Sequence, residues 1–186
     1  ACQQAKEWHK VMAGRPFHMA VNLSVRQFAA ENLLDFVREA LRESELPPGV
    51  LQLEITESLV MRDVEANVRL LKELREIGVR VGLDDFGTGH SSLMYLKRLP
   101  VDVLKIDRAF VQEIDTSSYD TAIVHSIIAL AESMKLEVIA EGVETVKQMK
   151  RLKREGCYHM QGYLFSAPLD REECDRLLRG IPDFEL

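Results

Sequence analysis

The sequence predicts an α/β protein built as a modified TIM-type (βα) barrel. Apolar segments with the spacing of strands alternate with amphipathic helical segments, and hairpin signals are few, which indicates βα units and a parallel sheet. The expected strands are apolar enough to be buried on both faces. Six such strands fit either an open doubly wound sheet or most of a barrel. Each strand ends in a polar side chain, and because the strand ends of a barrel form one rim, this pattern favours the barrel.

The start of the chain contains a helix, a strand and a second helical region. The helix is expected over residues 1–13, lacks an N-cap residue and ends at Gly14. An apolar strand follows over 17–23. Ser24 and Gln27 then form a capping-box pattern, which predicts that the second helical region begins at this point.

Prolines end the second helical region, and another strand and helix follow. Pro47 and the residues after it break the helix, and a strand over 51–55 carries Glu54 near its end. The segment 64–77 has the periodicity of an amphipathic helix. Gly78 closes it, since glycine adopts the left-handed conformation of a helix C-cap without strain.

Two adjacent carboxylates stand where the third strand should end. Val79, Val81 and Leu83 suit a strand, and Asp84 with Asp85 follows them. Neighbouring side chains of a regular strand point to opposite faces, so the two carboxylates converge only where the pleat relaxes. Close carboxylates repel each other unless a proton or a cation lies between them, and a divalent metal is the simplest solution. The alternative is that Asp85 caps the next helix or turn.

The second half of the chain repeats the alternation. Strands are expected over 101–106, 136–140 and 157–161, and helices are expected over 119–135 and 172–179. A further helix, short and basic, begins at Thr145 and stops at Gly156. No linker or low-complexity segment interrupts the chain, so residues 1–186 are expected to form a single domain.

The bulk composition excludes some classes of function. The chain has 24 basic and 30 acidic residues and a net charge of −6, which argues against duplex nucleic acid as a partner. No apolar run approaches the roughly 18 residues of a membrane span, so we expect no membrane contact from this chain. The three cysteines form no metal-ligand spacing and are expected to be reduced thiols of a cytoplasmic protein, or of the cytoplasmic domain of a membrane-attached one.

Polar side chains occur at the end of every expected strand. They are Asn22, Glu54, Asp84 with Asp85, Lys105, Glu141 and Gln161. Each has a separate structural explanation, such as a turn former or a surface ion pair, but one shared site explains all of them more simply. An amide and several carboxylates make an all-oxygen site for Mg²⁺ or Mn²⁺ rather than for zinc.

The chemistry of these residues fits phosphoester cleavage. Asp84 is placed to bridge two metal ions roughly 3.5–4 Å apart, an arrangement that generates hydroxide and neutralises the attacked phosphate. Lys105 stays charged beside carboxylates and can stabilise the transition state. Glu141 can bind the second metal or accept a proton from water. No Ser or Cys is paired with a His, and His90 and His159, the histidines expected nearest the rim, receive no role.

A loop with glycines follows the two aspartates. Phe86, Gly87, Thr88 and Gly89 have the features of a phosphate cradle, because glycine lets a ligand approach the backbone closely. The loop lacks the Lys-Ser/Thr ending of a P-loop. A plain connecting loop is the alternative.

Six segments together carry a resemblance to a known family. They read VNLS at 21–24, LEITES at 53–58, LDDFGTG at 83–89, VLKID at 103–107, IAEGVET at 139–145 and QGYLFS at 161–166. With these motifs the chain resembles the EAL domain, a bacterial phosphodiesterase domain. The resemblance implies a modified βα barrel and metal-dependent hydrolysis of cyclic di-GMP to linear pGpG by in-line attack of a metal-activated water, with two ions of Mg²⁺ or Mn²⁺.

The resemblance also implies roles for individual residues. The implied metal ligands are Asn22, Glu54, Asp84, Asp85 and Glu141, and the implied catalytic residues are Lys105 and Glu141. Glu57 resembles the anchor of the loop after Asp85. Glu144, Gln161 and Pro168 are expected near substrate or water. Family members pair through that loop, which is compatible with a homodimer, and sensory or GGDEF-type domains are expected upstream.

The chain departs from the family pattern in two places. His90 stands where the family usually has Tyr. The Glu-Ala-Leu signature, with its metal-binding Glu and phosphate-contacting Arg, is absent and is expected upstream of Ala1, so the domain is expected to be truncated at its N-terminus with six of about eight strands. Loss of a ligand would weaken metal binding. One alternative is therefore a catalytically impaired domain that binds cyclic di-GMP or a partner protein. A second alternative, from the chemistry of the carboxylates and the lysine alone, is an enolase-like barrel.

Overall fold

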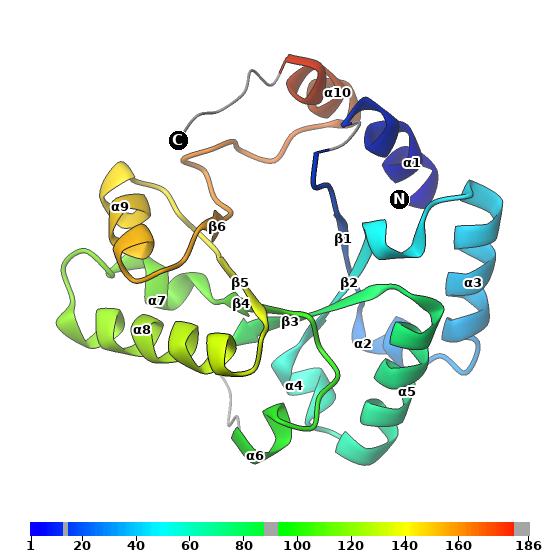
Figure 1. The fold of residues 1–186 in the computed structure, drawn as a ribbon, viewed down its shortest axis with the longest axis horizontal. Helices are drawn as coiled ribbons and strands as arrows, with labels where there is room; N and C mark the ends of the chain where they lie inside the picture. Colours follow the sequence, from blue (N-terminus) through cyan, green and yellow to red (C-terminus); the bar gives the residue numbers. More distant parts are fainter. Residues whose placement is uncertain (13–14, 88–92, 181–186) are drawn as a thin grey trace.

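The structure, a computed structural model, describes residues 1–12, 15–87 and 93–180. Its centre is a parallel sheet in which the strands follow one another in chain order (Figure 1). The strands are β1 (Met19–Asn22), β2 (Leu51–Thr56), β3 (Arg80–Phe86), β4 (Val103–Ile106), β5 (Glu137–Ala140) and β6 (His159–Met160). All five pairings are parallel. Six parallel strands with helices outside them form part of a barrel, which confirms the predicted fold, a modified (βα) barrel that is incomplete.

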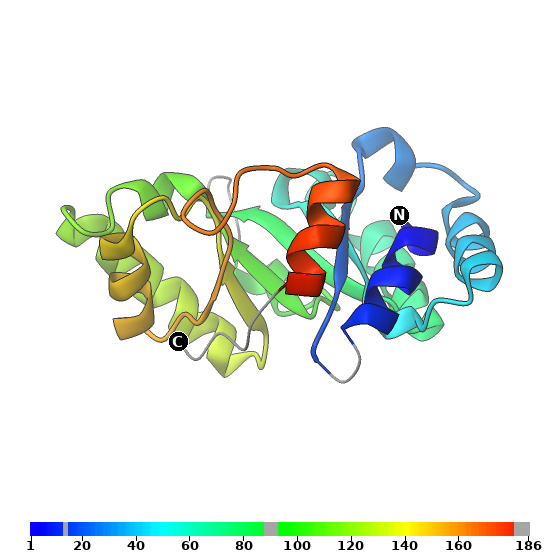
Figure 2. The ribbon, with the colours of Figure 1, turned by 90° about the horizontal axis from the view of Figure 1, so that it is seen from above.

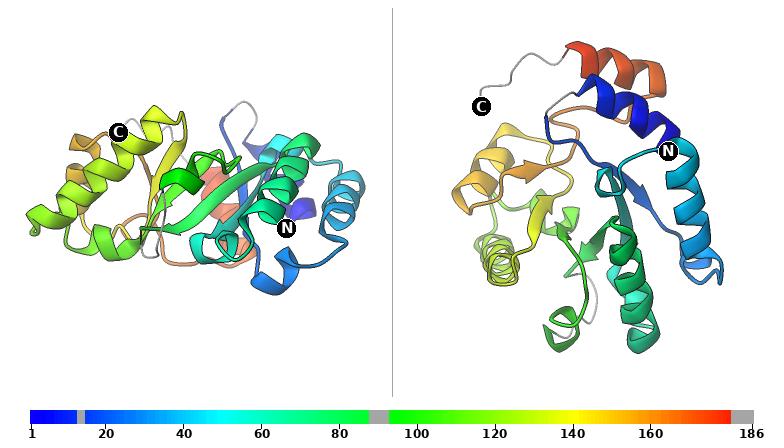
Figure 3. Two further views of the ribbon diagram at one scale, coloured as in Figure 1. Left: turned by 90° about the horizontal axis from the view of Figure 1, so that it is seen from below. Right: turned by 45° about the vertical axis from the view of Figure 1, so that its right-hand side comes forward.

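Helices lie outside the sheet, and Figure 3 shows α3, α5 and α8 running alongside the strands. The helices are α1 (Cys2–Val11), α2 (Val25–Phe28), α3 (Leu33–Ser44), α4 (Glu57–Val60), α5 (Val64–Ile77), α6 (Leu93–Leu96), α7 (Arg108–Gln112), α8 (Ser118–Ser133), α9 (Val146–Arg154) and α10 (Arg171–Gly180), with one 3-10 turn, η1 (Pro48–Val50). Within the described ranges, no helix has both the length and the apolar character needed to cross a bilayer.

Local sequence signals fix several of these helix ends. The Ser24 side chain accepts from the backbone of Gln27 in the predicted capping box at the start of α2. Thr145 and Gln148 form a second capping box at the start of α9. Gly78 ends α5 with a φ of 97°, as the C-cap prediction required.

The helices that the sequence analysis missed are short. α4, α6 and α7 have four or five residues each, too few for an amphipathic period to be recognised. The helical region after Ser24 is divided, because α2 ends at Phe28 and α3 begins only at Leu33. β6 covers two residues instead of the expected five, since β5 is its only pairing neighbour in the described sheet.

The hydrophobic core lies between the outer face of the sheet and the helices. Leu53 and Ile55 of β2 belong to this core, together with Leu71 of α5. Because strand side chains alternate, Gln52 and Glu54 of the same strand point to the opposite, inner face. In β2, polar side chains therefore lie on the concave side of the sheet and apolar side chains on its convex side.

The two ends of the chain pack together. α1 and α10 lie side by side in Figures 1 and 2. The Trp8 indole N–H donates to the Asp175 carboxylate, and Arg171 pairs with Glu7 at 2.9 Å. The C-terminal helix thus secures the N-terminal helix beside the open side of the sheet.

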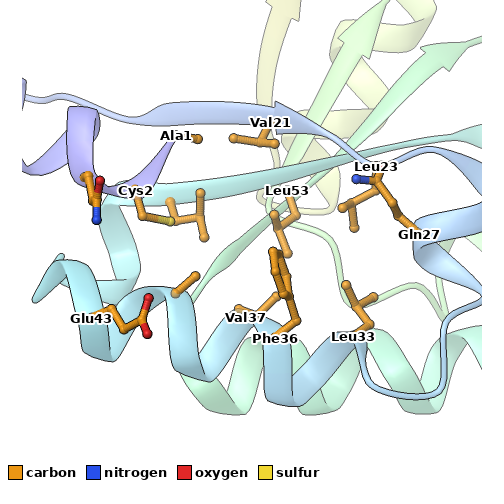
Figure 4. A pocket seen from close by; sticks show the side chains of 13 residues that line it. Ala1, Cys2, Val21, Leu23, Gln27, Leu33, Phe36, Val37, Glu43 and Leu53 are labelled. Carbon is orange, nitrogen blue, oxygen red and sulfur yellow. The ribbon is translucent and has the colours of Figure 1, made fainter.

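An apolar pocket of about 330 Å³ lies between α3 and the strands β1 and β2 (Figure 4). Val21 and Leu53 face Val37 and Phe36 across it, and the Phe36 side chain is exposed. Glu43 is the one charged residue among those that line it. The pocket therefore has no pair of polar groups suited to acid–base or metal chemistry, and the candidate active site lies elsewhere.

We predict that Gly162→Ala destabilises the protein. A Cβ at this position would lie 2.2 Å from the carbonyl oxygen of Val143 and 2.3 Å from its nitrogen, and backbone atoms cannot rotate away. The expected loss in the free energy of unfolding, measured by urea denaturation, is about 3 kcal/mol. Gly180→Ala is the matched control, because among the described residues no atom outside its own helix and chain neighbours lies within 4 Å of its Cβ position. If Gly162→Ala lowered the free energy of unfolding no more than the control does, the close contact between Gly162 and the Val143 backbone would be wrong.

Candidate active site

A β-bulge in β3 brings two adjacent carboxylates to one place. Leu83 pairs with Leu104 and Phe86 pairs with Ile106, so Asp84 and Asp85 together lie opposite one residue of β4. Asp85 has a φ of 56°, a left-handed conformation that Asp tolerates better than most residues. The prediction that β3 ends at the aspartates is therefore wrong. The strand continues to Phe86, and the extra residue turns both carboxylates toward the same side.

The residue of β4 that lies opposite the bulge is Lys105, and it is surrounded by carboxylates. Its ammonium nitrogen lies 2.8 Å from Glu54 Oε2, 3.3 Å from Asp84 Oδ2 and 2.6 Å from Glu141 Oε1. These acids come from β2, from β3 and from the residue after β5, so three separate βα units meet at one cation. Lys105 is only 3% exposed. The carboxyl ends of the strands thus converge as the barrel hypothesis requires.

Glu54 is held in place by a residue that the sequence analysis missed. Gln52 Nε2 donates to Glu54 Oε1 at 3.0 Å, so both oxygens of the buried carboxylate are occupied. Gly82 lies beside this pair, and a Cβ there would come within 3.2 Å of Gln52 Nε2. The signal was present in the sequence, because Gln52 stands two residues before Glu54 in an otherwise apolar strand and must share its face.

The electrostatics show an excess of negative charge. Burial alone would lower the pKa of Lys105, but hydrogen bonds to Glu141 and Glu54 outweigh it and hold the pKa above its ordinary value. Burial raises the pKa of Glu141 in spite of its bond to Lys105. Burial and the nearby carboxylates of Asp84 and Asp107 raise the pKa of Asp85. One ammonium therefore does not neutralise the four carboxylates around it.

Three of these acids form a group suited to a metal ion. Carboxylate oxygens of Asp84, Asp85 and Glu141 lie within 4.8 Å of one another. An all-oxygen donor set of this kind fits Mg²⁺ or Mn²⁺. The other two predicted ligands, Glu54 and Asn22, lie on the neighbouring strands β2 and β1. Glu54 is bound to Lys105, and Asn22 is the partner of Glu54 in the ladder between β1 and β2.

The loop after β3 is fastened by Glu57. Its carboxylate is 2% exposed, and Oε2 accepts from the Gly87 N–H at 3.1 Å. Gly87 has a φ of 96°, and a Cβ there would lie 2.9 Å from the Phe110 ring. Phe86 is the last residue of β3 and is buried. Thr88 and Gly89, the rest of the expected cradle, lie outside the described residues.

A hollow of about 230 Å³ adjoins the carboxylates. Its lining includes Glu141, Glu144 and Gln161, three of the predicted site residues, together with Arg108 and Tyr163. The sequence analysis missed Arg108, which follows the short apolar strand β4 without a recognisable motif. Pro168 is exposed and does not line this hollow.

His159 lies at the opposite end of the sheet from the carboxylates. It begins β6, and its Nε2 is 3.8 Å from Oε1 of Glu137, the first residue of β5. Arg80 bonds both Glu137 and His18, so these groups form a polar layer at the amino ends of the strands. The prediction that His159 lies near the rim is therefore wrong. His90 lies outside the described residues.

Comparison with known proteins identifies one family. The family described as EAL domain matches residues 1–168. MucR of Pseudomonas aeruginosa, named a bifunctional diguanylate cyclase/cyclic di-GMP phosphodiesterase, is 47% identical over 174 residues, which are 93% of this chain and 25% of MucR. NbdA of the same organism, named a cyclic di-GMP phosphodiesterase, is 43% identical over 97% of this chain and 23% of its own length. The chain thus spans about a quarter of these relatives.

Solved structures agree with this result. The EAL domain of Mycobacterium smegmatis DcpA superposes with a TM-score of 0.90 at 42% identity, covering 98% of this chain and 82% of that one. The MucR phosphodiesterase in complex with c-di-GMP gives a TM-score of 0.88 at 47% identity, covering 94% and 70%. A complex of Klebsiella pneumoniae BlrP1 with manganese and the dinucleotide gives 0.79 at 31% identity, covering 89% and 42%.

We predict that Lys105→Met destabilises the metal-free protein by about 3–5 kcal/mol at neutral pH, because buried carboxylates lose their counter-ion. The pKa of Lys105 is higher in the folded protein than in the unfolded chain. Its contribution to the free energy of unfolding is therefore fully present at pH values below the unfolded pKa and is lost only as pH rises through the folded pKa. In the variant, the unpaired acids have raised pKa values, so its stability falls as pH rises through them. The difference in free energy of unfolding between the wild type and the variant should therefore become smaller toward acidic pH.

Urea denaturation at several pH values measures this effect. Lys72→Met, a change of an exposed lysine on α5, is the control and should change the free energy of unfolding by no more than about 0.5 kcal/mol. A deficit that does not depend on pH would contradict the assigned electrostatics.

Proposed function

The chain belongs to the EAL domain family, and on that basis we propose that it hydrolyses cyclic di-GMP to linear pGpG in a reaction that requires Mg²⁺ or Mn²⁺. The relatives named as cyclic di-GMP phosphodiesterases support the reaction and the substrate. The BlrP1 complex with manganese supports the use of a divalent ion. The resemblance alone would not separate an enzyme from a domain that lost its activity, so the residues around Lys105 carry the proposal.

The observation that carries it is the gathering of four carboxylates on one ammonium. Glu54, Asp84 and Glu141 contact Lys105, and Asp85 lies with the last two in the group of oxygens described above. The site keeps a surplus of negative charge around the buried Lys105, while Asp85 and Glu141 are only partly buried and open to ions from solvent. Divalent cations bound there would neutralise this surplus. A domain that held the dinucleotide, itself an anion, without divalent ions would gain nothing from this surplus.

The proposed ligands of the ions are Asp84, Asp85 and Glu141, with Glu54 and Asn22 beside them. Divalent ions bound there would lower the pKa of a coordinated water and neutralise the phosphodiester. Glu141 lies closest to the adjoining hollow, since it contributes to both the group of oxygens and the hollow lining. We assign to it the binding of an ion or the acceptance of a proton from water.

Lys105 has two proposed tasks. Its ammonium orients Glu54, Asp84 and Glu141 before substrate binds, so little reorganisation is needed during the reaction. Its raised pKa keeps it charged through the physiological range, and the positive charge opposes the negative charge that develops on the phosphate. Glu57 acts at a distance by fixing the Gly87 backbone. Glu144, Gln161 and Arg108 offer polar groups to the dinucleotide along the hollow. Pro168 and the loop residues Thr88 and Gly89 remain predicted contacts.

We propose that the activity belongs to a larger protein. The curated relatives are about four times as long as the matched segment, and MucR is named for a cyclase as well as a phosphodiesterase activity. A sensory or GGDEF-type domain in the same polypeptide would fit this pattern. The Glu-Ala-Leu signature before Ala1, the homodimer and the cytoplasmic location stay predictions.

Turnover of cyclic di-GMP by the protein with Mn²⁺ tests the proposed function. We expect pGpG as the product, and we expect EDTA to abolish its formation. Asp84→Asn should lower kcat/KM by about 100-fold or more, since it removes a charged ligand without changing the side-chain shape. Asp35→Asn, the same change at an exposed position on α3, is the matched control and should leave kcat/KM unchanged.

Two outcomes would contradict the proposal. Cyclic di-GMP that binds in the presence of Mn²⁺ but yields no pGpG would favour the alternative, a regulatory binding or protein-interaction domain. Equal turnover by the Asp84→Asn variant and the wild type would show that the reaction does not take place at the Lys105 cluster. Far-UV circular dichroism of each variant separates lost activity from lost folding.

A further inference from the structure

A row of cations runs along one side of α9. They are spaced three and four residues apart, so they share one face over about 10 Å of helix. Together with two residues of the turn between α7 and α8 they line a surface hollow of about 310 Å³, whose lining is Lys147, Lys150, Arg151, Arg154, Asp115 and Thr116. None of these residues belongs to the candidate active site, and Figure 1 shows α9 beside α7 on the outside of the sheet.

The two walls of this hollow are tied together. Gln148, on the inner side of α9, is buried, and its Nε2 donates to the backbone carbonyl of Gln112 at the end of α7, at 3.1 Å. The Gln148 Oε1 accepts from the Thr145 N–H, which fixes the start of α9. On the opposite wall the Thr116 hydroxyl donates to the carbonyl of Glu113. The hollow is therefore preformed, which lowers the entropic cost of binding a ligand.

Within the described residues, only one of the four cations forms an ion pair. Arg151 pairs with Glu155 at 2.9 Å. Across the described part of the chain, Lys147, Lys150 and Arg154 have no carboxylate within ion-pair distance, and Asp115 is the one acid that lines the hollow. The whole chain carries a net charge of −6, yet α9 contains five basic residues and no acidic one. This local reversal of charge needs its own explanation.

Helix stability explains only part of the reversal. Basic residues in the last turn of α9 interact favourably with the helix dipole. Lys147 stands in the first turn, where a cation is unfavourable, and Lys150 lies in the middle of the helix, where the dipole has little effect. Neither lysine is therefore accounted for by the stability of α9.

We propose that this hollow binds a small ligand that carries two or more phosphoryl groups. Lys147, Lys150 and Arg154 form no ion pair within the described residues, and the hollow that they line with Arg151 contains one carboxylate, that of Asp115. This surplus of positive charge suits a compact polyanion, because Arg and Lys bind phosphoryl oxygens well. An extended polyanion such as duplex nucleic acid would also meet the acidic remainder of the chain and be repelled. The site lies outside the carboxylate cluster and does not depend on turnover of cyclic di-GMP.

Calorimetric titration with inorganic tripolyphosphate tests the proposal, without divalent metal and without cyclic di-GMP. We expect saturable binding of one tripolyphosphate per chain that weakens as salt is added. The double variant Lys150→Gln, Arg154→Gln should lower the affinity at least about tenfold, because it removes two charges that pair with no acid among the residues the structure describes. Asp115→Asn should raise the affinity roughly threefold, since it removes the one opposing charge.

The matched control is Arg69→Gln, Lys72→Gln on the exposed side of α5, which removes the same two charges elsewhere. It should leave the affinity unchanged. The proposal is overturned if no saturable binding occurs, or if both double variants weaken binding equally. Binding to vesicles that contain phosphatidylglycerol, with none to tripolyphosphate, would assign the face to lipid headgroups and also overturn the small-ligand proposal. Thermal melts confirm that each variant folds.

Discussion

The buried ammonium of Lys105 is the constraint on which the rest of the structure depends. It contacts carboxylates contributed by three βα units, so the carboxyl ends of the strands in those units must lie close together. The bulge at Asp84 and Asp85 adds a fourth carboxylate without adding a strand. Gln52 donates a hydrogen bond to Glu54, and Gly82 leaves room for the Gln52 side chain because it has no Cβ. Burying Lys105 without its acids would destabilise the fold, and burying the acids without Lys105 would destabilise it more. The cluster and the parallel order of the strands therefore stabilise each other.

Much of this arrangement could be read from the sequence. The alternation of strand and helix gave the parallel order, and local caps at Ser24, Gly78 and Thr145 gave the helix ends, because these signals depend on neighbouring residues alone. The polar residue at each strand end gave most of the cluster. The bulge could not be predicted, since it depends on the register between β3 and β4. The wrong placement of His159 has a related cause: only the pairing of β6 shows that this residue begins the strand.

The distribution of charge divides the molecule by function. Acidic side chains gather on the concave face of the sheet, where Lys105 neutralises them only in part. The opposite end of the same face is closed by a compensated layer in which Arg80 pairs with Glu137. Positive side chains gather on α9, outside the sheet, where Lys147, Lys150 and Arg154 form no ion pair within the described residues. A cation is therefore expected on the concave face of the sheet and an anion on the outer side of α9.

Anomalous diffraction from crystals of the protein soaked with Mn²⁺ tests the central claim most directly. If the carboxylates around Lys105 form a divalent-metal site, the strongest anomalous peak will lie between Asp84, Asp85 and Glu141, within about 2.0–2.2 Å of their oxygens. Manganese found only elsewhere on the surface, with the cluster unchanged and Lys105 still its sole cation, would contradict the account.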